Sequence, residues 1–153
     1  MSSLCALALM TAVCCGLWSV ISAAVGLVTW IGFASCTTYF ACDCKGIMGV
    51  KRTIACNLLG VFCAMLAIWL GNWIPILNSL GFCSALISFI MCMLSKYKLF
   101  SYCPGIFIGC FSTFAANGNL KELIPALLVG AFLGLACDYS GKWFYRKISK
   151  NQV

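Results

Sequence analysis

The sequence predicts an all-α polytopic membrane protein with six transmembrane helices arranged as two inverted three-helix repeats. Three observations lead to this prediction: the composition, the long apolar runs and the placement of the basic residues. Of the 153 residues, 63% are hydrophobic and only 8% are charged, with a mean hydropathy of +1.05. A soluble globular protein has about 25% charged residues, so this chain cannot build a water-facing surface. The lipid bilayer is therefore its expected partner.

Six apolar runs approach the length of about 20 residues that a helix needs to cross the hydrocarbon. They are 4–24, 27–42, 53–72, 76–95, 99–116 and 121–139. The runs are continuous, which favours helices, because the strands of a membrane β-barrel alternate apolar and polar residues. The second and fifth runs are short and rich in Gly, Ser, Thr and Cys, so each is either a full span or a partly re-entrant helix. Residues 1–153 form a single membrane domain, with a basic tail over 140–153.

Nine of the ten basic residues fall on one side of these six spans. They are Lys45, Lys51, Arg52, Lys96, Lys98, Lys142, Arg146, Lys147 and Lys150. Only Lys121 falls on the other side. An excess of Lys and Arg in short loops marks the cytoplasmic side, so both termini are predicted to be cytoplasmic. This placement also explains the net charge of +7, and no nucleic-acid partner is expected.

The chain contains a candidate internal repeat. Segments 33–41 and 107–115 share the pattern F-x-x-C-x-x-x-F-A at an offset of 74 residues. Each unit would hold three helices, over about 4–72 and about 76–139, and an odd number of helices inverts the second unit relative to the first. Coincidence is the alternative, because a chain rich in Phe, Cys, Ala and Gly matches itself easily.

A stripe of small residues spaced by four occurs in the third and in the sixth run, at an offset of 70 residues. The two stripes are Cys56, Gly60 and Ala64, and Ala126, Gly130 and Gly134. Residues four apart lie on one face of a helix, where small side chains let another backbone approach closely. We expect helix-packing seams here. The alternative, a bare backbone that lines a pore, is less favoured.

Polar and aromatic side chains gather in the two short runs and are candidates for lining a path. They are Phe33, Cys36, Thr37, Thr38, Tyr39, Phe107, Cys110, Ser112 and Thr113. A hydroxyl in hydrocarbon is costly unless bonded, so it should face protein or water. The alternatives are structural: a hydroxyl can bond the helix carbonyl four residues earlier, and Phe rings commonly pack in cores.

Two further polar features have structural interpretations. Asn57, inside the third run, is expected to hydrogen-bond between helices rather than to bind a substrate. Asp138 and Lys142 are four residues apart at the end of the sixth run and are expected to pair.

Several classes of function are disfavoured. The chain has no His and only three acidic residues, so we expect no enzyme. The 13 cysteines show no C-x-x-C spacing, so no metal or other cofactor is expected, although a thiolate site for copper(I) or zinc at the cytoplasmic ends of the spans is the alternative. No ionisable residue lies in the middle of a run, which favours passive movement of a neutral solute over a proton-driven pump.

The chain resembles the YcdZ-like family of small bacterial inner-membrane proteins, a domain of unknown function. The resemblance covers nearly the whole length. Residues 36–41 (C-T-T-Y-F-A) are similar to the family's C-T-A-Y-F-A, and 104–109 (P-G-I-F-I-G) with 113–115 (T-F-A) are similar to P-G-x-F-I-G followed by T-F-A. The family's cysteine lies one place after the position of Cys110, so no role of a cysteine is carried over. The resemblance implies a multi-pass protein of the bacterial inner membrane and supplies no substrate.

Together these observations predict a channel or facilitator for a small neutral or weakly charged solute of unknown identity, acting as a homo-oligomer. The first alternative is a membrane-embedded solute-binding subunit that needs an energising partner. The second is a structural or regulatory membrane protein, in which the small-residue seams serve assembly only.

Overall fold

The computed structural model describes residues 2–73 and 81–150, and all regular structure in them is helical. The helices are α1 (Ser3–Val25), α2 (Thr29–Ala41), α3 (Gly46–Trp73), α5 (Phe82–Leu94), η1 (Lys98–Phe100), α6 (Cys103–Ala115) and α7 (Leu120–Lys150). Of these, η1 is a single 3-10 turn. The all-α prediction is therefore confirmed.

Three of the six predicted spans are helices long and apolar enough to cross a bilayer. These are α1, α3 and α7, with 23, 28 and 31 residues. Helices α2, α5 and α6 have 13 residues each, which corresponds to about 20 Å against about 30 Å of hydrocarbon. Part of the predicted fourth span, 76–80, lies outside the described residues.

Two long helices extend beyond the predicted spans. Helix α3 begins at Gly46 instead of residue 53, and α7 continues through the predicted tail to Lys150. Hydropathy locates the apolar part of a helix, whereas the start of α3 is held by packing of Val50 against Tyr39 and Ala131. The helices are therefore longer than their apolar segments.

The fifth span begins later than predicted. Residues 98–100 form η1, and α6 begins at Cys103 with Pro104 in its first turn. Proline has no backbone N–H, but the first turn of a helix has no acceptor for that group, so Pro104 suits the start of α6.

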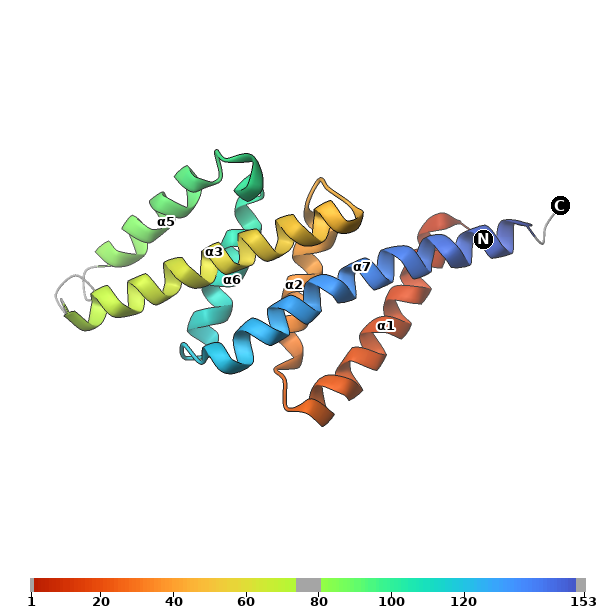
Figure 1. Cartoon of the computed structure of the whole chain (residues 1–153), viewed down its shortest axis with the longest axis horizontal. Helices are drawn as coiled ribbons and strands as arrows, with labels where there is room; N and C mark the ends of the chain where they lie inside the picture. Colours follow the sequence, from red (N-terminus) through yellow and green to blue (C-terminus); the bar gives the residue numbers. More distant parts are fainter. Residues whose placement is uncertain (1, 74–80, 151–153) are drawn as a thin grey trace.

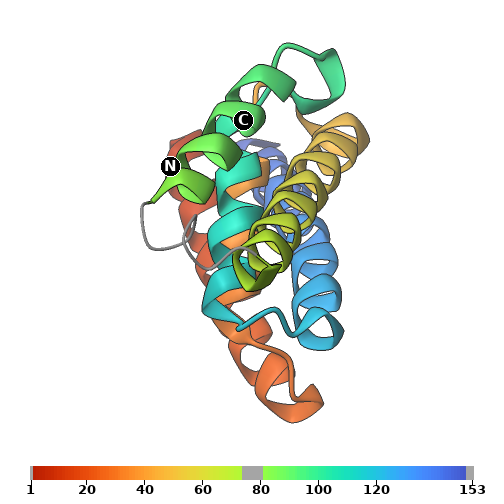
Figure 2. The same ribbon diagram turned by 90° about the vertical axis from the view of Figure 1, so that its left-hand side faces the viewer.

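Helices α2 and α6 lie side by side in the middle of the molecule, and each is crossed by a long helix from the other half of the chain (Figure 1). α2 packs mainly against α7, and α6 packs mainly against α3. Seen from the α5 end, α3 and α7 lie on one flank of the α2–α6 pair (Figure 2). Helices α1 and α5 lie at opposite ends, against α7 and α3 respectively (Figure 1). The start of α1 and the end of α7 lie at the same end of the molecule.

Buried apolar side chains join these layers. Cys63, Ile87, Met91 and Ile106 belong to a cluster that connects α3, α5 and α6. Another cluster contains Ile31, Val61, Leu123, Ala126 and Leu127 and connects α2, α3 and α7. The centre of the molecule is thus built from α2, α3, α6 and α7.

Candidate functional site

A buried polar cluster lies where α2 meets α3 and α7. Asn57 of α3 donates from Nδ2 to Ser35 Oγ (2.9 Å) and accepts at Oδ1 from Thr38 Oγ1 (3.2 Å). Ser35 Oγ in turn donates to the carbonyl oxygen of Leu127 (2.6 Å). We call Ser35, Thr38 and Asn57 the central cluster. It confirms the predicted interhelical role of Asn57 and links three helices.

The backbones around the central cluster approach so closely that only glycine fits. A Cβ on Gly109 of α6 would overlap the backbone carbonyl of Asn57, and one on Gly60 would overlap that of Ile106. On the opposite side, a Cβ on Gly130 of α7 would overlap the backbone of Gly32. Side chains are therefore excluded at the points where the helices cross, and α6 reaches the backbone of Asn57 directly.

Two further buried hydroxyls lie on α3 and α6, the helices that cross at Gly60 and Gly109. Among the described residues, Thr53 Oγ1 and Ser112 Oγ are buried side-chain atoms without a hydrogen-bond partner. Thr53 lies one turn before Asn57 on α3, and Ser112 lies one turn after Gly109 on α6, so each shares a helix face with a residue of the crossing. An unpartnered buried polar group costs about 1–3 kcal/mol, so these two positions require an explanation.

The predicted path residues fall into three environments. Cys36, Thr38, Tyr39, Cys110, Ser112 and Thr113 are buried, Phe33 is half-buried, and Thr37 and Phe107 are exposed. Of these nine residues, only Thr38 belongs to the central cluster. Thr37 Oγ1 and Thr113 Oγ1 bond the carbonyls of Phe33 (3.0 Å) and Gly109 (2.8 Å), four residues earlier in each case.

The small residues of the two stripes lie in contacts between helices. Gly60 faces the backbone of Ile106 and Cys110 on α6, Gly130 faces Gly32 on α2, and Gly134 faces the Tyr39 side chain. Cys56, Ala64 and Ala126 are fully buried. Gly32 and Gly109 take part in the same crossings and were not predicted, although Gly109 lies four residues after Gly105, a spacing that could have indicated it.

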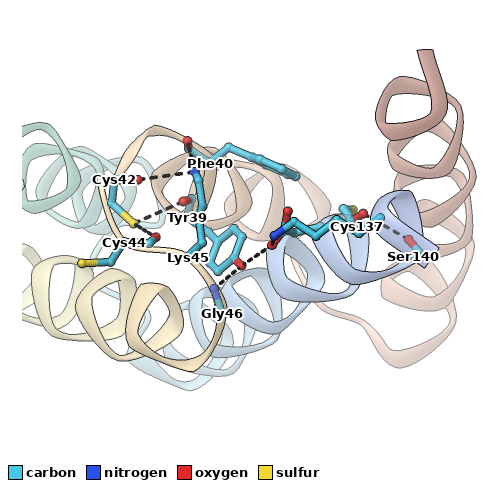
Figure 3. A network of polar contacts seen from close by, with 10 residues as sticks. Tyr39, Phe40, Cys42, Cys44, Lys45, Gly46, Cys137 and Ser140 are labelled. Carbon is cyan, nitrogen blue, oxygen red and sulfur yellow. Dashed lines mark hydrogen bonds and ion pairs between the residues drawn. The ribbon is translucent and has the colours of Figure 1, made fainter. Parts of the chain in front are cut away.

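A second polar group fastens the α2–α3 loop to α7 (Figure 3). Asp138, 6% exposed, accepts at Oδ2 from Lys142 Nζ (2.7 Å) and from Tyr39 Oη (3.3 Å). The backbone N–H of Gly46 donates to Tyr39 Oη (2.9 Å). The predicted Asp138–Lys142 pair is confirmed. The role of Tyr39 here was missed, because its partner Asp138 lies 99 residues away in the sequence.

An apolar cavity of about 370 Å³ lies between α3, α5 and α6. Its lining includes Ile87, Met91, Phe107, Cys110, Phe111 and Phe114. Two predicted path residues, Phe107 and Cys110, thus face this cavity and not the central cluster. Elsewhere in the described residues, no three Cys, Asp or Glu side chains gather where they could hold a metal ion.

Comparisons with known proteins show which family the chain belongs to. The family described as "protein of unknown function (DUF1097)" matches residues 8–142. The chain is 36% identical to "Inner membrane protein YcdZ" of Escherichia coli K12 over 98% of its own length and 93% of the relative's. It is 35% identical to the protein of that name from Salmonella typhimurium, with 94% and 90% covered. It is also 28% identical to "Uncharacterized protein YahC" of E. coli, with 93% of each chain covered. No solved structure matches the chain. The chain therefore belongs to the DUF1097 family and is related to the YcdZ inner-membrane proteins.

Proposed function

We propose that this protein is an inner-membrane facilitator for a small neutral or weakly charged solute, whose path runs between α2 and α6. The observation that carries the proposal is the pair of buried hydroxyls, Thr53 Oγ1 and Ser112 Oγ, that have no partner among the described residues. A core that served packing alone would gain stability by replacing them with apolar groups. Hydroxyls that bond a passing solute or water explain why they are retained.

The proposed architecture is six spans in two inverted units, and matched contacts at the two crossings support it. Gly60 meets Ile106 at one crossing, and Gly130 meets Gly32 at the other. The two glycines of the long helices are 70 residues apart, and their partners are 74 residues apart, which are the two offsets of the sequence repeat. α2 and α6 also have equal lengths and bounds that differ by 74 residues.

A second pair of contacts obeys the same offsets. Gly109 of α6 lies against the backbone carbonyl of Asn57, while Ser35 of α2 bonds the carbonyl of Leu127. Ser35 and Gly109 are 74 residues apart, and Asn57 and Leu127 are 70 residues apart. Inverted repeats have transport sites at the interface between units, and the α2–α6 contact is part of that interface here.

Three further observations support the proposed location and orientation. The relatives are named inner-membrane proteins. The start of α1 and the end of α7 lie at the same end of the molecule, as an even number of crossings requires (Figure 1). The excess of Lys and Arg on that side supports a cytoplasmic location for both termini.

In the described conformation the central cluster is closed to solvent, since Ser35, Thr38 and Asn57 are at most 1% exposed. Passage of a solute therefore requires the side chains to part. The bonds of Asn57 on α3 to Thr38 (3.2 Å) and Ser35 (2.9 Å) on α2 are the side-chain contacts that would open.

Stopped-flow light scattering on proteoliposomes tests this proposal. Wild-type protein is challenged with urea, glycerol and short-chain weak acids, beside the variants Thr38→Val and Ser112→Ala. Both variants should slow uptake of one solute several-fold. Thr37→Val is the matched control, because Thr37 is exposed and bonds only its own helix, and its uptake should equal that of wild type. Unchanged uptake in Thr38→Val and Ser112→Ala, or no uptake by folded wild-type protein, would refute the proposal.

The apolar cavity between α3, α5 and α6 favours a second candidate function, a solute-binding subunit with an energising partner. Its volume of about 370 Å³ falls within the range of small-molecule sites. Copurification of an ATPase with the tagged protein, together with a bound apolar solute, would support this candidate over the facilitator.

A further inference from the structure

Two cysteines face each other where α5 ends and α6 begins. The Sγ atoms of Cys92 and Cys103 lie 4.0 Å apart. Cys92 is exposed and Cys103 is partly exposed. The connection between the two helices contains η1 and folds back on itself, which brings the two thiols together (Figure 1). We propose that Cys92 and Cys103 are a redox modification site, at which a reversible disulfide fastens α5 to α6.

The geometry fits this chemistry. A disulfide has a sulfur–sulfur bond of about 2.05 Å, so the two sulfurs must approach by about 2 Å, within reach of rotation about the Cα–Cβ bonds. Both residues lie at helix termini, Cys92 in the last turn of α5 and Cys103 at the first position of α6. The short connection keeps the two thiols near each other without long-range folding contacts.

The proposed oxidant is hydrogen peroxide. It oxidises the exposed Cys92 thiol to a sulfenic acid and releases one water. The Cys103 sulfur then attacks the Cys92 sulfur, the S–S bond forms, and the hydroxyl group leaves with the thiol proton as a second water. The two thiols lose two electrons and two protons in total, and peroxide is reduced to two waters. Attack by a thiolate of a cellular dithiol reverses the step.

Other cysteines of the chain are engaged differently. Cys42 Sγ donates to the carbonyls of Tyr39 (3.2 Å) and Cys44 (3.1 Å). Cys56 Sγ donates to the carbonyl of Leu99 (3.8 Å), and Cys14 Sγ lies 3.8 Å from Ser140 Oγ. For Cys42 and Cys56, the neighbouring acceptor is therefore an oxygen and not a sulfur.

The disulfide would form beside the apolar cavity. Met91, the residue before Cys92, lines the apolar cavity between α3, α5 and α6. A covalent link at this end of the cavity would fix α5 relative to α6, in addition to the apolar contacts of Ile87 and Met91 with Ile106. The inference needs only the positions of the two thiols, so it holds whether or not the protein moves a solute.

Tryptic mass spectrometry tests the inference on the full chain. The purified protein is treated with hydrogen peroxide, alkylated and digested with trypsin without reductant. The exposed Lys96 and Lys98 lie between the two cysteines, so cleavage there separates peptide 53–96 from peptide 99–121. A disulfide keeps the two peptides joined until dithiothreitol is added.

Two-cysteine variants identify which sulfurs are joined. One keeps Cys92 and Cys103 and replaces the other cysteines by serine. The matched control keeps Cys83 and Cys103, so the same two peptides carry one cysteine each. Cys83 lies nine residues before Cys92 on α5, about 13 Å away along the helix axis, and should not reach Cys103. Cys103→Ala in the otherwise native chain serves as a second, less invasive variant.

We expect the joined peptides in oxidised wild type and in the Cys92/Cys103 variant. The joined peptides should be absent from the Cys83/Cys103 control. In Cys103→Ala, no peptide should be joined through Cys92. Equal joining in the control would overturn the inference. So would full alkylation of both Cys92 and Cys103 in wild type after peroxide treatment.

Discussion

The two helix crossings share a backbone geometry but differ in chemistry. Where α2 meets α7, Gly130 admits the backbone of Gly32, and Ser35 adds a hydrogen bond to the carbonyl of Leu127. Where α6 meets α3, Gly60 and Gly109 both lie directly against backbone, and the nearby Ser112 hydroxyl has no partner among the described residues. Close approach is thus kept at both crossings, whereas hydrogen bonding across the contact is confined to the first. The same close approach of two backbones therefore occurs both with and without a hydrogen bond across it.

The largest expected effect tests the shared geometry. Gly60→Ala and Gly130→Ala should each destabilise the protein by about 3 kcal/mol or more, because the added Cβ meets backbone that cannot move aside. Thermal unfolding and gel filtration in mild detergent would measure the loss. Gly16→Ala is the matched control, since nothing lies within 4 Å of a Cβ there. Similar tolerance at all three glycines would contradict the shared close approach.

The next effect concerns the α2–α7 crossing, which contains a hydrogen bond. Ser35→Ala removes the bond to Leu127 and leaves Asn57 Nδ2 buried without its acceptor, so stability should fall by about 1–2 kcal/mol. A double-mutant cycle with Asn57→Leu would show coupling, because both changes act on the same bond. Additive losses in reversible unfolding would mean that the cluster does not act as a unit.

A smaller effect is expected at the second polar group. Tyr39→Phe keeps the ring but removes the hydroxyl that bonds Gly46 N and Asp138, so stability should fall by about 1 kcal/mol. Amide hydrogen exchange should rise at Gly46 while the central cluster stays protected. Unchanged exchange at Gly46 would show that the loop does not need this contact.

The smallest expected effect is a gain in stability, and it concerns the α3–α6 crossing. Ser112→Ala removes a buried hydroxyl with no partner in the described residues, so the free energy of unfolding should rise by up to about 1 kcal/mol. Chemical denaturation in detergent micelles measures it. Thr113→Val, which loses a bond to the Gly109 carbonyl, should not stabilise the protein and is the neighbouring control. A loss of stability in Ser112→Ala would show that the hydroxyl has a structural role.

Features set by local spacing were predictable from the sequence. Residues four apart share a helix face, which explains the Asp138–Lys142 pair and the small-residue positions such as Gly60. The all-α fold also follows from apolar runs that must satisfy their backbone in lipid.

Features that depend on tertiary packing were not predictable. The bond of Ser35 to Leu127 spans 92 residues, and the bond of Tyr39 to Asp138 spans 99, so nothing in the local pattern indicates either contact. The start of α3 at Gly46 and the end of α7 at Lys150 were missed because the spans were defined by hydropathy. Polar and charged turns that continue the helix beyond the apolar run do not raise the hydropathy there.

The length of α7 has a practical consequence for imaging this protein. Thirty-one helical residues span about 46 Å, roughly 15 Å more than the hydrocarbon. Its basic final turns therefore form a continuous helical rod at the end of a chain of only 16.5 kDa. A helical fusion partner joined in register to this rod would be held rigidly, giving electron cryomicroscopy a fiducial for particle alignment without disturbing either crossing.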